Sequence, residues 1–379
     1  MNVLVANLGS TSFKFKVLDS DKNFTEIAKG SFERIGQAET QTGTNFSDHA
    51  HVISHILPTL PRIDAIGFKA VHGGPISGAV RVTQHVLDTM QEFADVAPAH
   101  NPPYISAMKA FAEKLPDVPQ VAAFETAFHQ TIPLARQIFA VPYEWFEKFG
   151  IRRYGFHGAS HRYIAGRAHE LAPTARRVIS CHLGGSSSVT GIVDQKSVYN
   201  SFGMTAQTGV MHNNRVGDFD TFALLKLLAS GMQLDQIFQT LGKKSGLLGI
   251  SGVSNDMRDI EIAAANDNDQ NYTRARLAID AFIEDVRRHI GAAMVACGGC
   301  DLLAFTAGIG ENGAAIRQLI CRDLAFAGIV LDEKLNITRG TEFRINAASS
   351  RAQIWIMPTN EELVVAQQTV QVLSAEITA

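Results

Sequence analysis

The chain has 379 residues, which suits two domains better than one. Hydrophobic residues make up 46% and charged residues 19%, so large cores are expected and extensive disorder is excluded. The net charge is −3 without a dense basic run, and MNVLVANLGSTS is too short an apolar start for a signal peptide or membrane helix. With four scattered cysteines, the sequence predicts a soluble cytoplasmic α/β enzyme that binds neither nucleic acid nor membrane.

Short apolar strands alternate with helical patterns along the chain. VLVANLG and FKFKVLD flank a Gly/Ser/Thr turn and predict a hairpin. Five further segments predict buried strands that end at small or polar residues, as strands do beside a ligand: AIGFKAVHGG, PQVAAFETAF, RRVISCHLGG, DLLAFTAGIG and AQIWIMPTN. The clearest helix is predicted over 272–296, where apolar residues recur at helical spacing before Gly298 and Gly299. A helix over 361–373 closes the chain.

The first hairpin has a counterpart in the middle of the chain. RVISCH-LGGSSS-VTGIVD repeats the order of strand, Gly/Ser turn and strand, with Gly184 in the place of Gly9. Backbone amides and hydroxyls in such turns can converge on an anion. Either turn alone is as easily an ordinary hairpin, but the pair favours a duplicated fold that grips a polyphosphate from both sides.

Further motifs resemble those of one known family, the acetate kinases, within the superfamily of actin-like proteins, sugar kinases and Hsp70 ATPases. They are NLGSTSFKFK, HNPP at 100–103, RRYGFHGASH at 152–161, KKSGLLGISGVSNDMRDIE at 243–261, FTAGIGENGAAIR at 305–317 and TNEEL at 359–363. The resemblance implies two actin-like, ribonuclease H-like α/β domains with mixed sheets and flanking helices. The first would comprise residues 1–129 and 363–379 and the second residues 130–362, with the active site in the cleft between them.

The resemblance implies a reversible transfer of a phosphoryl group from ATP to acetate or a related short-chain carboxylate, giving acyl phosphate and ADP. It also implies Mg²⁺, with Mn²⁺ as an alternative, and a homodimer. Such a transfer depends on in-line positioning and on neutralisation of the phosphoryl oxygens. The rival interpretations are a kinase of the same fold for a larger or substituted acid such as propionate, and a non-catalytic nucleotide-binding homologue.

Two of the implied catalytic residues match the family. Arg215, in NNRVGDFD, matches its catalytic arginine, and a planar fork of donors suits a phosphoryl or carboxylate group. The alternative for Arg215 is a salt bridge to Asp218. His157, between glycines in GFHG, matches the histidine that stabilises the transferring group.

The other two implied catalytic residues depart from the family. Lys69 stands where the family has arginine, so it keeps the charge but loses the bidentate fork, which Arg81 could supply instead. Glu125 replaces an aspartate and is one methylene longer. Asn7 and Glu361 are implied to hold the metal, with the carboxylate of Glu125 near it. Both glutamates could instead cap the helix that follows them.

The nucleotide is expected to contact several loops. The implied residues are Asn7, Ser10, Ser12 and Lys14 in the first turn, His182, Gly184 and Gly185 in the second, Asp256 and Arg258 around adenine and ribose, and Gly308, Ile309, Gly310, Glu311 and Asn312 in the adenosine loop. Cys297 and Cys300 have the spacing of half a metal site, but no second pair follows, so two small buried residues are the favoured interpretation.

The pocket for the acid is expected to be wide. By motif its wall consists of Val71, Ala99, Phe156 and Ala206, with His100 beside it unless that histidine only serves the turn. Where this chain has its two alanines, the family has leucine and proline. Each extra methylene contributes about 0.8 kcal/mol when space exists for it. The sequence therefore predicts that propionate or a larger acid is used at least as well as acetate, unless neighbouring side chains fill the gap.

Overall fold

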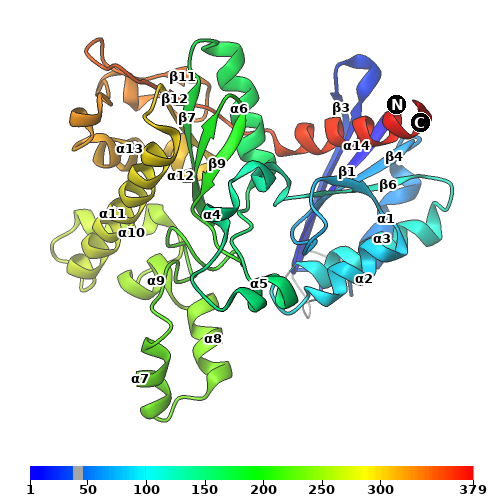
Figure 1. Ribbon diagram of the computed structural model, residues 1–379, viewed down its shortest axis with the longest axis horizontal. Coiled ribbons are helices and arrows are strands. Elements are labelled where there is room, and N and C mark those ends of the chain that lie inside the picture. Colours follow the sequence, from blue (N-terminus) through cyan, green and yellow to red (C-terminus); the bar gives the residue numbers. More distant parts are fainter. Residues whose placement is uncertain (37–45, 99, 379) are drawn as a thin grey trace.

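The computed structural model describes residues 1–36, 46–98 and 100–378 and contains two six-stranded mixed sheets (Figure 1). The strands of the first are β1 (Asn2–Gly9), β2 (Ser12–Asp19), β3 (Thr25–Glu33), β4 (Ala65–Ala70), β5 (Ala79–Arg81) and β6 (Gln120–Phe124). Their order is β3-β2-β1-β4-β6-β5. The central strands β1, β4 and β6 are parallel, so their carboxyl ends meet at one edge.

The second sheet repeats this arrangement. Its strands are β7 (Arg177–Leu183), β8 (Ser187–Val193), β9 (Lys196–Asn200), β10 (Leu302–Thr306), β11 (Phe343–Arg344) and β12 (Gln353–Ile356). The order β11-β12-β10-β7-β8-β9 is the order of the first sheet read from its other end. Both β1–β2 and β7–β8 are antiparallel hairpins in equivalent places, which confirms the duplicated fold predicted from the two Gly/Ser turns.

Helices cover both faces of the first sheet. On one face lie α1 (His49–Ile56), α2 (Gln84–Glu92) and α3 (Asn101–Lys114), and on the other α14 (Glu361–Thr378). Strand β1 serves both cores, because Leu4 and Ala6 face the first cluster while Val3 and Val5 face α14. A Cβ on Gly67 would lie 2.3 Å from Thr369 Oγ1, so glycine lets α14 pack directly on β4.

The second sheet is enclosed in the same way. One face carries α10 (Met257–Ala265), α11 (Tyr272–Cys297) and α13 (Ala314–Cys321), and the other carries α6 (Gly158–Leu171). The helix predicted over 272–296 is confirmed as α11, and Gly298 ends it in the left-handed region at φ +72°. The final helix, predicted to 373, continues to Thr378. The remaining helices are α4 (Leu134–Gln137), α5 (Tyr143–Phe149), α7 (Ala223–Ala229), α8 (Leu234–Lys243), α9 (Gly246–Ser251) and α12 (Ala307–Asn312).

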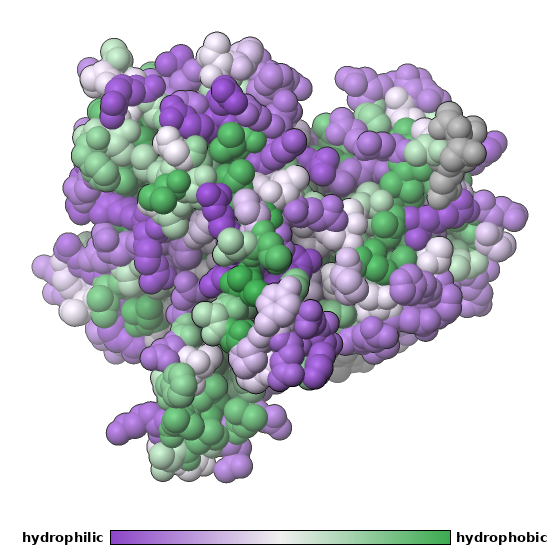
Figure 2. Space-filling view, in the orientation of Figure 1, coloured by the Kyte–Doolittle hydropathy of each residue, from purple (hydrophilic) through white to green (hydrophobic). Residues whose placement is uncertain are grey.

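Helices α7 and α8 form an arm that projects from the second half (Figure 1). Figure 2 shows this arm as a largely hydrophobic protrusion. Its exposed apolar side chains are Phe222, Leu225, Leu228, Met232, Leu234 and Phe238. None of the helices in residues 1–36, 46–98 and 100–378 combines the length and apolarity that a membrane span requires. The domain limits near residues 129 and 363 stay a prediction, to which the packing of α14 on the first sheet lends support.

Candidate active site

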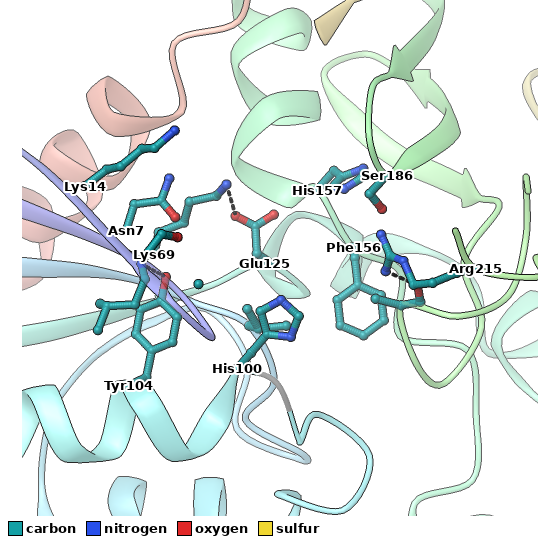
Figure 3. Close-up of a pocket in the computed structure, with 15 residues that line it drawn as sticks. Asn7, Lys14, Lys69, His100, Tyr104, Glu125, Phe156, His157, Ser186 and Arg215 are labelled. Carbon is teal, nitrogen blue, oxygen red and sulfur yellow. Dashed lines mark hydrogen bonds and ion pairs between the residues drawn. The ribbon is translucent and has the colours of Figure 1, made fainter. Parts of the chain in front are cut away.

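A cavity of about 320 Å³ lies between the two halves, where the strand ends face each other. Figure 3 shows Asn7, Lys69 and Tyr104 on one side and Phe156, His157 and Arg215 on the other, with Glu125 and His100 between them. The lining residues are Asn7, Leu8, Gly9, Ser12, Lys14, Lys69, Val71, His100, Tyr104, Glu125, Phe156, His157, Ser186, Ala206 and Arg215. The predicted catalytic residues and three members of the acid pocket wall are thus brought together.

A few predicted residues are not in this lining. Ser10 is exposed in the first turn, and Ala99 lies outside the described residues. Conversely, Tyr104 and Ser186 line the cavity but were not singled out from the sequence. The buried Tyr104 hydroxyl accepts a 2.9 Å hydrogen bond from the amide of Leu8 and so ties α3 to the end of β1. Its place directly after HNPP was the available signal.

Lys69 lies between two buried carboxylates. Its Nζ is 3.6 Å from Glu125 Oε1 and forms a closer ion pair with Glu361. Burial raises the pKa of Glu125 to about 7, against the opposing charge of Lys69. Burial alone would lower the pKa of Lys69, but the charges of Glu361 and Glu125 raise it above its ordinary value, so Lys69 stays protonated. Arg81 is exposed on the edge strand β5 and does not line the cavity.

Neither Glu125 nor Glu361 caps the helix that follows it. The short 3₁₀ turn after Glu125 has no side-chain cap, and both carboxylate oxygens of Glu125 are buried without a hydrogen-bond partner. At the start of α14 the side chain of Asn360 accepts the 3.2 Å hydrogen bond from the amide of Leu363, which leaves Glu361 available to the cleft.

The oxygen donors of this region fit a hard divalent cation. Mg²⁺ favours carboxylate oxygens together with water and substrate phosphate. The carboxylates of Glu125 and Glu361, which share the Lys69 ammonium, and the amide oxygen of Asn7 are of this kind, although Glu361 itself is not in the cavity lining. In the described residues no three His, Cys, Asp or Glu side chains are arranged to hold a metal ion. A cation here would therefore depend on phosphate and water oxygens to complete its shell.

Arg215 is a partly buried cation without an acidic partner among the described residues. Its Nη1 donates to the carbonyl oxygen of Ala206 at 2.5 Å, and burial lowers its pKa to about 10. The alternative partner, Asp218, instead has its Oδ2 3.7 Å from Arg288 Nη2 and 3.8 Å from His289 Nε2. A buried guanidinium without a counter-charge is costly, so its position favours an anionic ligand.

His157 is fixed at the first turn of α6. It occupies the left-handed region at φ +57°, which is strained for a residue with a Cβ. The next residue, Gly158, donates its amide to Glu125 O at 2.9 Å, and a Cβ there would lie 2.1 Å from the same oxygen. This contact clamps α6 to the end of β6. Burial, with the neighbouring His182 and His161, lowers the pKa of His157 well below 6.5, so the ring is neutral.

Two further histidines border this centre. The rings of His157 and His182 stack with centroids 4.0 Å apart, although His182 itself does not line either cavity described here. His100, which precedes α3, does line the cavity. Burial, together with the charges of Arg215 and Lys69, lowers its pKa to about 4.

A second cavity of about 460 Å³ lies in the second half. Of the predicted nucleotide residues, its lining includes Gly184, Gly185, Asp256, Arg258, Gly308, Ile309 and Asn312. Gly310 and Glu311 are elsewhere: Glu311 Oε1 accepts the amide of Ala307 at 2.8 Å, and Gly310 O accepts from the buried Arg317 at 2.8 Å. The turn after β7 joins the two cavities, because Gly184 and Gly185 line the second and Ser186 lines the first.

Comparison with known proteins gives whole-chain matches. The model of the acetokinase family matches residues 2–367. The acetate kinase of Halothermothrix orenii is 39% identical over 404 residues, covering 99% of this chain and 100% of that protein. The crystal structure of Porphyromonas gingivalis acetate kinase has a TM-score of 0.88 at 37% identity, covering 98% of this chain and 99% of that one. A propionate kinase from Francisella tularensis has a TM-score of 0.90 at 34% identity, with the same coverage.

Proposed function

The chain belongs to the acetokinase family, and we propose that it transfers the γ-phosphoryl group of ATP reversibly to acetate, giving acetyl phosphate and ADP. It is thus a phosphotransferase with a carboxyl group as acceptor. One observation carries the proposal. The turn at 184–186 borders both cavities, so a nucleotide in the second cavity would direct its phosphates toward Arg215 and His157 in the first.

The residues of the first cavity have separate tasks in this proposal. Arg215 neutralises charge on the phosphoryl oxygens as the transition state forms, because its guanidinium is buried and has no competing carboxylate in the described chain. His157 donates a hydrogen bond as a neutral ring. Asn7, Glu361 and Glu125 would hold Mg²⁺, which when bound neutralises phosphate charge. The charge of Lys69 opposes the effect of burial on Glu125 and holds the carboxylate of Glu361 in place.

In the second cavity, Asp256 and Arg258 are proposed to border the adenosine. Arg258 Nε donates to Asp256 Oδ1 at 2.9 Å, and Asp256 also caps α10 by accepting the amide of Arg258. Gly308 and Ile309 bring backbone close to the same space. ATP and ADP are therefore the proposed co-substrates.

Propionate is the second candidate for the acceptor. Val71, Phe156 and Ala206 line the first cavity together, as the pocket interpretation requires. At position 206 the wall has a single methyl, and the carbonyl of the same residue holds Arg215. An acid with one more methylene would contact this part of the wall.

A hydroxamate assay with ATP, Mg²⁺ and a panel of acids tests the proposal. Formation of acyl hydroxamate with acetate supports the main function, and a higher kcat/KM with propionate supports the second candidate. ATP binding without product from any short-chain acid would contradict both. Arg215→Ala is the matched control, because it removes the phosphoryl contact and leaves the nucleotide cavity intact.

We also propose that the protein is a cytoplasmic homodimer that uses the α7–α8 arm as its interface. Phe222 is 77% exposed and Leu225 63% exposed on this arm, and an apolar patch of this kind is typical of a surface that another protein covers. The four cysteines are free thiols, as suits a reducing compartment. Sedimentation of the wild type and of Phe222→Asp tests the interface. A wild-type monomer would contradict it.

A further inference from the structure

A line of alternating serine and histidine side chains runs from the interior of the second half to the first cavity. Ser188 Oγ on β8 lies 2.8 Å from both His157 Nδ1 and His161 Nε2. The other ring nitrogen of His161, Nδ1, lies 2.9 Å from Ser180 Oγ on β7. Ser180, Ser188 and His161 have no exposed surface, so the line is shielded from solvent until it reaches His157.

The number of hydrogens restricts this line to two arrangements. A serine hydroxyl has one hydrogen to donate, and a neutral imidazole has one N–H and one accepting nitrogen. Ser188 touches two ring nitrogens, so it donates to one histidine and accepts from the other. If Ser188 donates to His157 Nδ1, His161 Nε2 donates to Ser188 and Ser180 donates to His161 Nδ1. The reverse arrangement places the hydrogen of His157 on Nδ1.

The count of hydrogens holds because burial keeps both rings neutral, so neither ring has a second hydrogen. Desolvation, with the neighbouring histidines, lowers the pKa of His157 and of His161 well below 6.5. A protonated His157 would also add a cation to a cavity that already holds Lys69 and Arg215. The line therefore couples the tautomers of His157 and His161, so that selecting one arrangement sets the position of the hydrogen on both rings.

The neighbouring His129 differs from His157 because its own hydrogen-bond partners determine its tautomer. His129 Nε2 lies 2.9 Å from the carbonyl oxygen of Phe156, and a carbonyl can only accept, so this nitrogen must be the donor. Its Nδ1 therefore accepts from Ser197, 2.9 Å away. Among the described residues, the ring of His157 forms a hydrogen bond with Ser188 alone, and a hydroxyl can donate or accept.

The ligand bound in the cavity selects between the two arrangements. With Nδ1 bound to Ser188, Nε2 is the nitrogen left for a ligand in the cavity that His157 lines. A lone pair there would repel a phosphoryl or carboxylate oxygen, whereas an N–H would bind it. We propose that Ser188 and His161 are positioning residues that hold His157 in the tautomer with its hydrogen on Nε2, directed at the phosphoryl group. The ligand in this statement rests on the proposed function.

Nitrogen chemical shifts of ¹⁵N-labelled histidines test the tautomer in the protein saturated with inorganic phosphate, which supplies the oxygen that selects the arrangement. The wild type is expected to show a protonated Nε2 and an unprotonated Nδ1 at His157, assigned by the signals lost in His157→Gln. In Ser188→Ala the two shifts should move toward each other as both tautomers become populated. A wild-type ring with its hydrogen on Nδ1, or shifts unchanged in Ser188→Ala, would overturn the proposal.

Ser197→Ala is the matched control, because it removes an equally buried serine–histidine contact elsewhere. The tautomer of His129 is set by the carbonyl of Phe156, so the shifts of His157 should stay at their wild-type values. Ser188→Ala and Ser197→Ala each lose one buried hydrogen bond of a hydroxyl. If their losses in Tm are similar, a general weakening of the fold does not explain a difference in their His157 shifts. A His157 shift change of equal size in both variants would contradict a specific role for Ser188.

Kinetics extend the test to the reaction. Loss of the residue that orients a metal-bound histidine typically costs about 10- to 100-fold. By analogy, we expect a decrease of this size in kcat for Ser188→Ala with little change in the KM for ATP. Ser197→Ala should retain the wild-type kcat. Equal kcat values for Ser188→Ala and the wild type would overturn the positioning role. If the wild type forms no acyl phosphate, the proposed function fails while the tautomer measurement still stands by itself.

Discussion

Replacement of Lys69 by methionine would leave Glu125 and Glu361 facing each other in the cleft without the ammonium group that now lies between them. The side chains of Lys69, Glu125 and Glu361 are 17%, 6% and 12% exposed, so water screens these charges weakly. Removing one partner of such a buried pair costs about 3–5 kcal/mol. We expect the free energy of unfolding to fall by this amount at about pH 8, where both carboxylates must ionise.

The same variant should be far less affected in acid. Without Lys69 the folded-state pKa of Glu125 rises further above the unfolded value of 4.5, and the pKa of Glu361, which the charge of Lys69 lowers in the wild type, rises as well. The folded protein then binds more protons than the unfolded chain in this range. Stability is then highest near or below pH 4.5 and is lost as the pH rises through the folded pKa, which is already about 7 for Glu125 in the wild type. Denaturant unfolding in EDTA at about pH 5 and about pH 8 measures the difference.

Two controls separate charge from packing. Lys69→Arg keeps a cation and should lose much less stability than Lys69→Met. The double variant Lys69→Met with Glu361→Gln removes the repulsion between carboxylates and should recover part of the loss at about pH 8. If Lys69→Met is as stable as the wild type at that pH, or the double variant is no more stable than the single one, the reasoning about this charge cluster is wrong.

Three other predictions concern the reaction. Arg215→Ala should lower kcat by at least about 10²-fold with a smaller change in the KM for ATP, because the guanidinium acts mainly in the transition state; a coupled ADP assay that finds kcat within a few-fold of the wild type would remove it from the catalytic residues. Propionate should have a kcat/KM at least equal to that of acetate, and Ala99→Leu should shift the preference back; a preference for acetate of more than about tenfold would mean that the pocket is not enlarged. Lys69→Arg and Glu125→Asp each restore the family's residue, and each alone should lower kcat/KM. The double variant should recover kcat/KM, because a longer cation then meets a shorter carboxylate. Additive losses in the double variant would contradict the pairing.

Local patterns in the sequence were sufficient for the architecture. Short apolar runs predicted the strands β1, β2, β4, β6, β7, β8, β10 and β12. The paired Gly/Ser turns predicted the duplication, and Gly298 ended α11 as expected. The length of α14 was underestimated, since no glycine or proline follows residue 373 to mark its end.

The site could be predicted less completely from the sequence, because its contacts join segments that are far apart in the chain. The sequence offered Arg81 as a residue that could compensate for the arginine replaced by Lys69, and only the order of β4, β6 and β5 puts Arg81 on an edge strand away from the cavity. RRYGFHGASH contains His161, but its serine partners come from β7 and β8. Glu311 was expected at the nucleotide, yet its carboxylate holds the amide of Ala307 instead, a choice that depends on the turn geometry after β10.

The packing of α14 on the first sheet has a consequence for synthesis on the ribosome. Val365, Ala366 and Leu373 complete the apolar cluster that covers Val3 and Val5, although they are made after every strand of the second sheet. Domains generally fold in the order in which they emerge, from the N-terminus onward. Here one face of the first sheet stays uncovered until α14 has been made, whereas the helices that cover the second sheet precede α14 in the chain. The middle of the polypeptide can therefore mature before its beginning, and a ribosome that stalls shortly before α14 would hold an unfinished first half beside a finished second one.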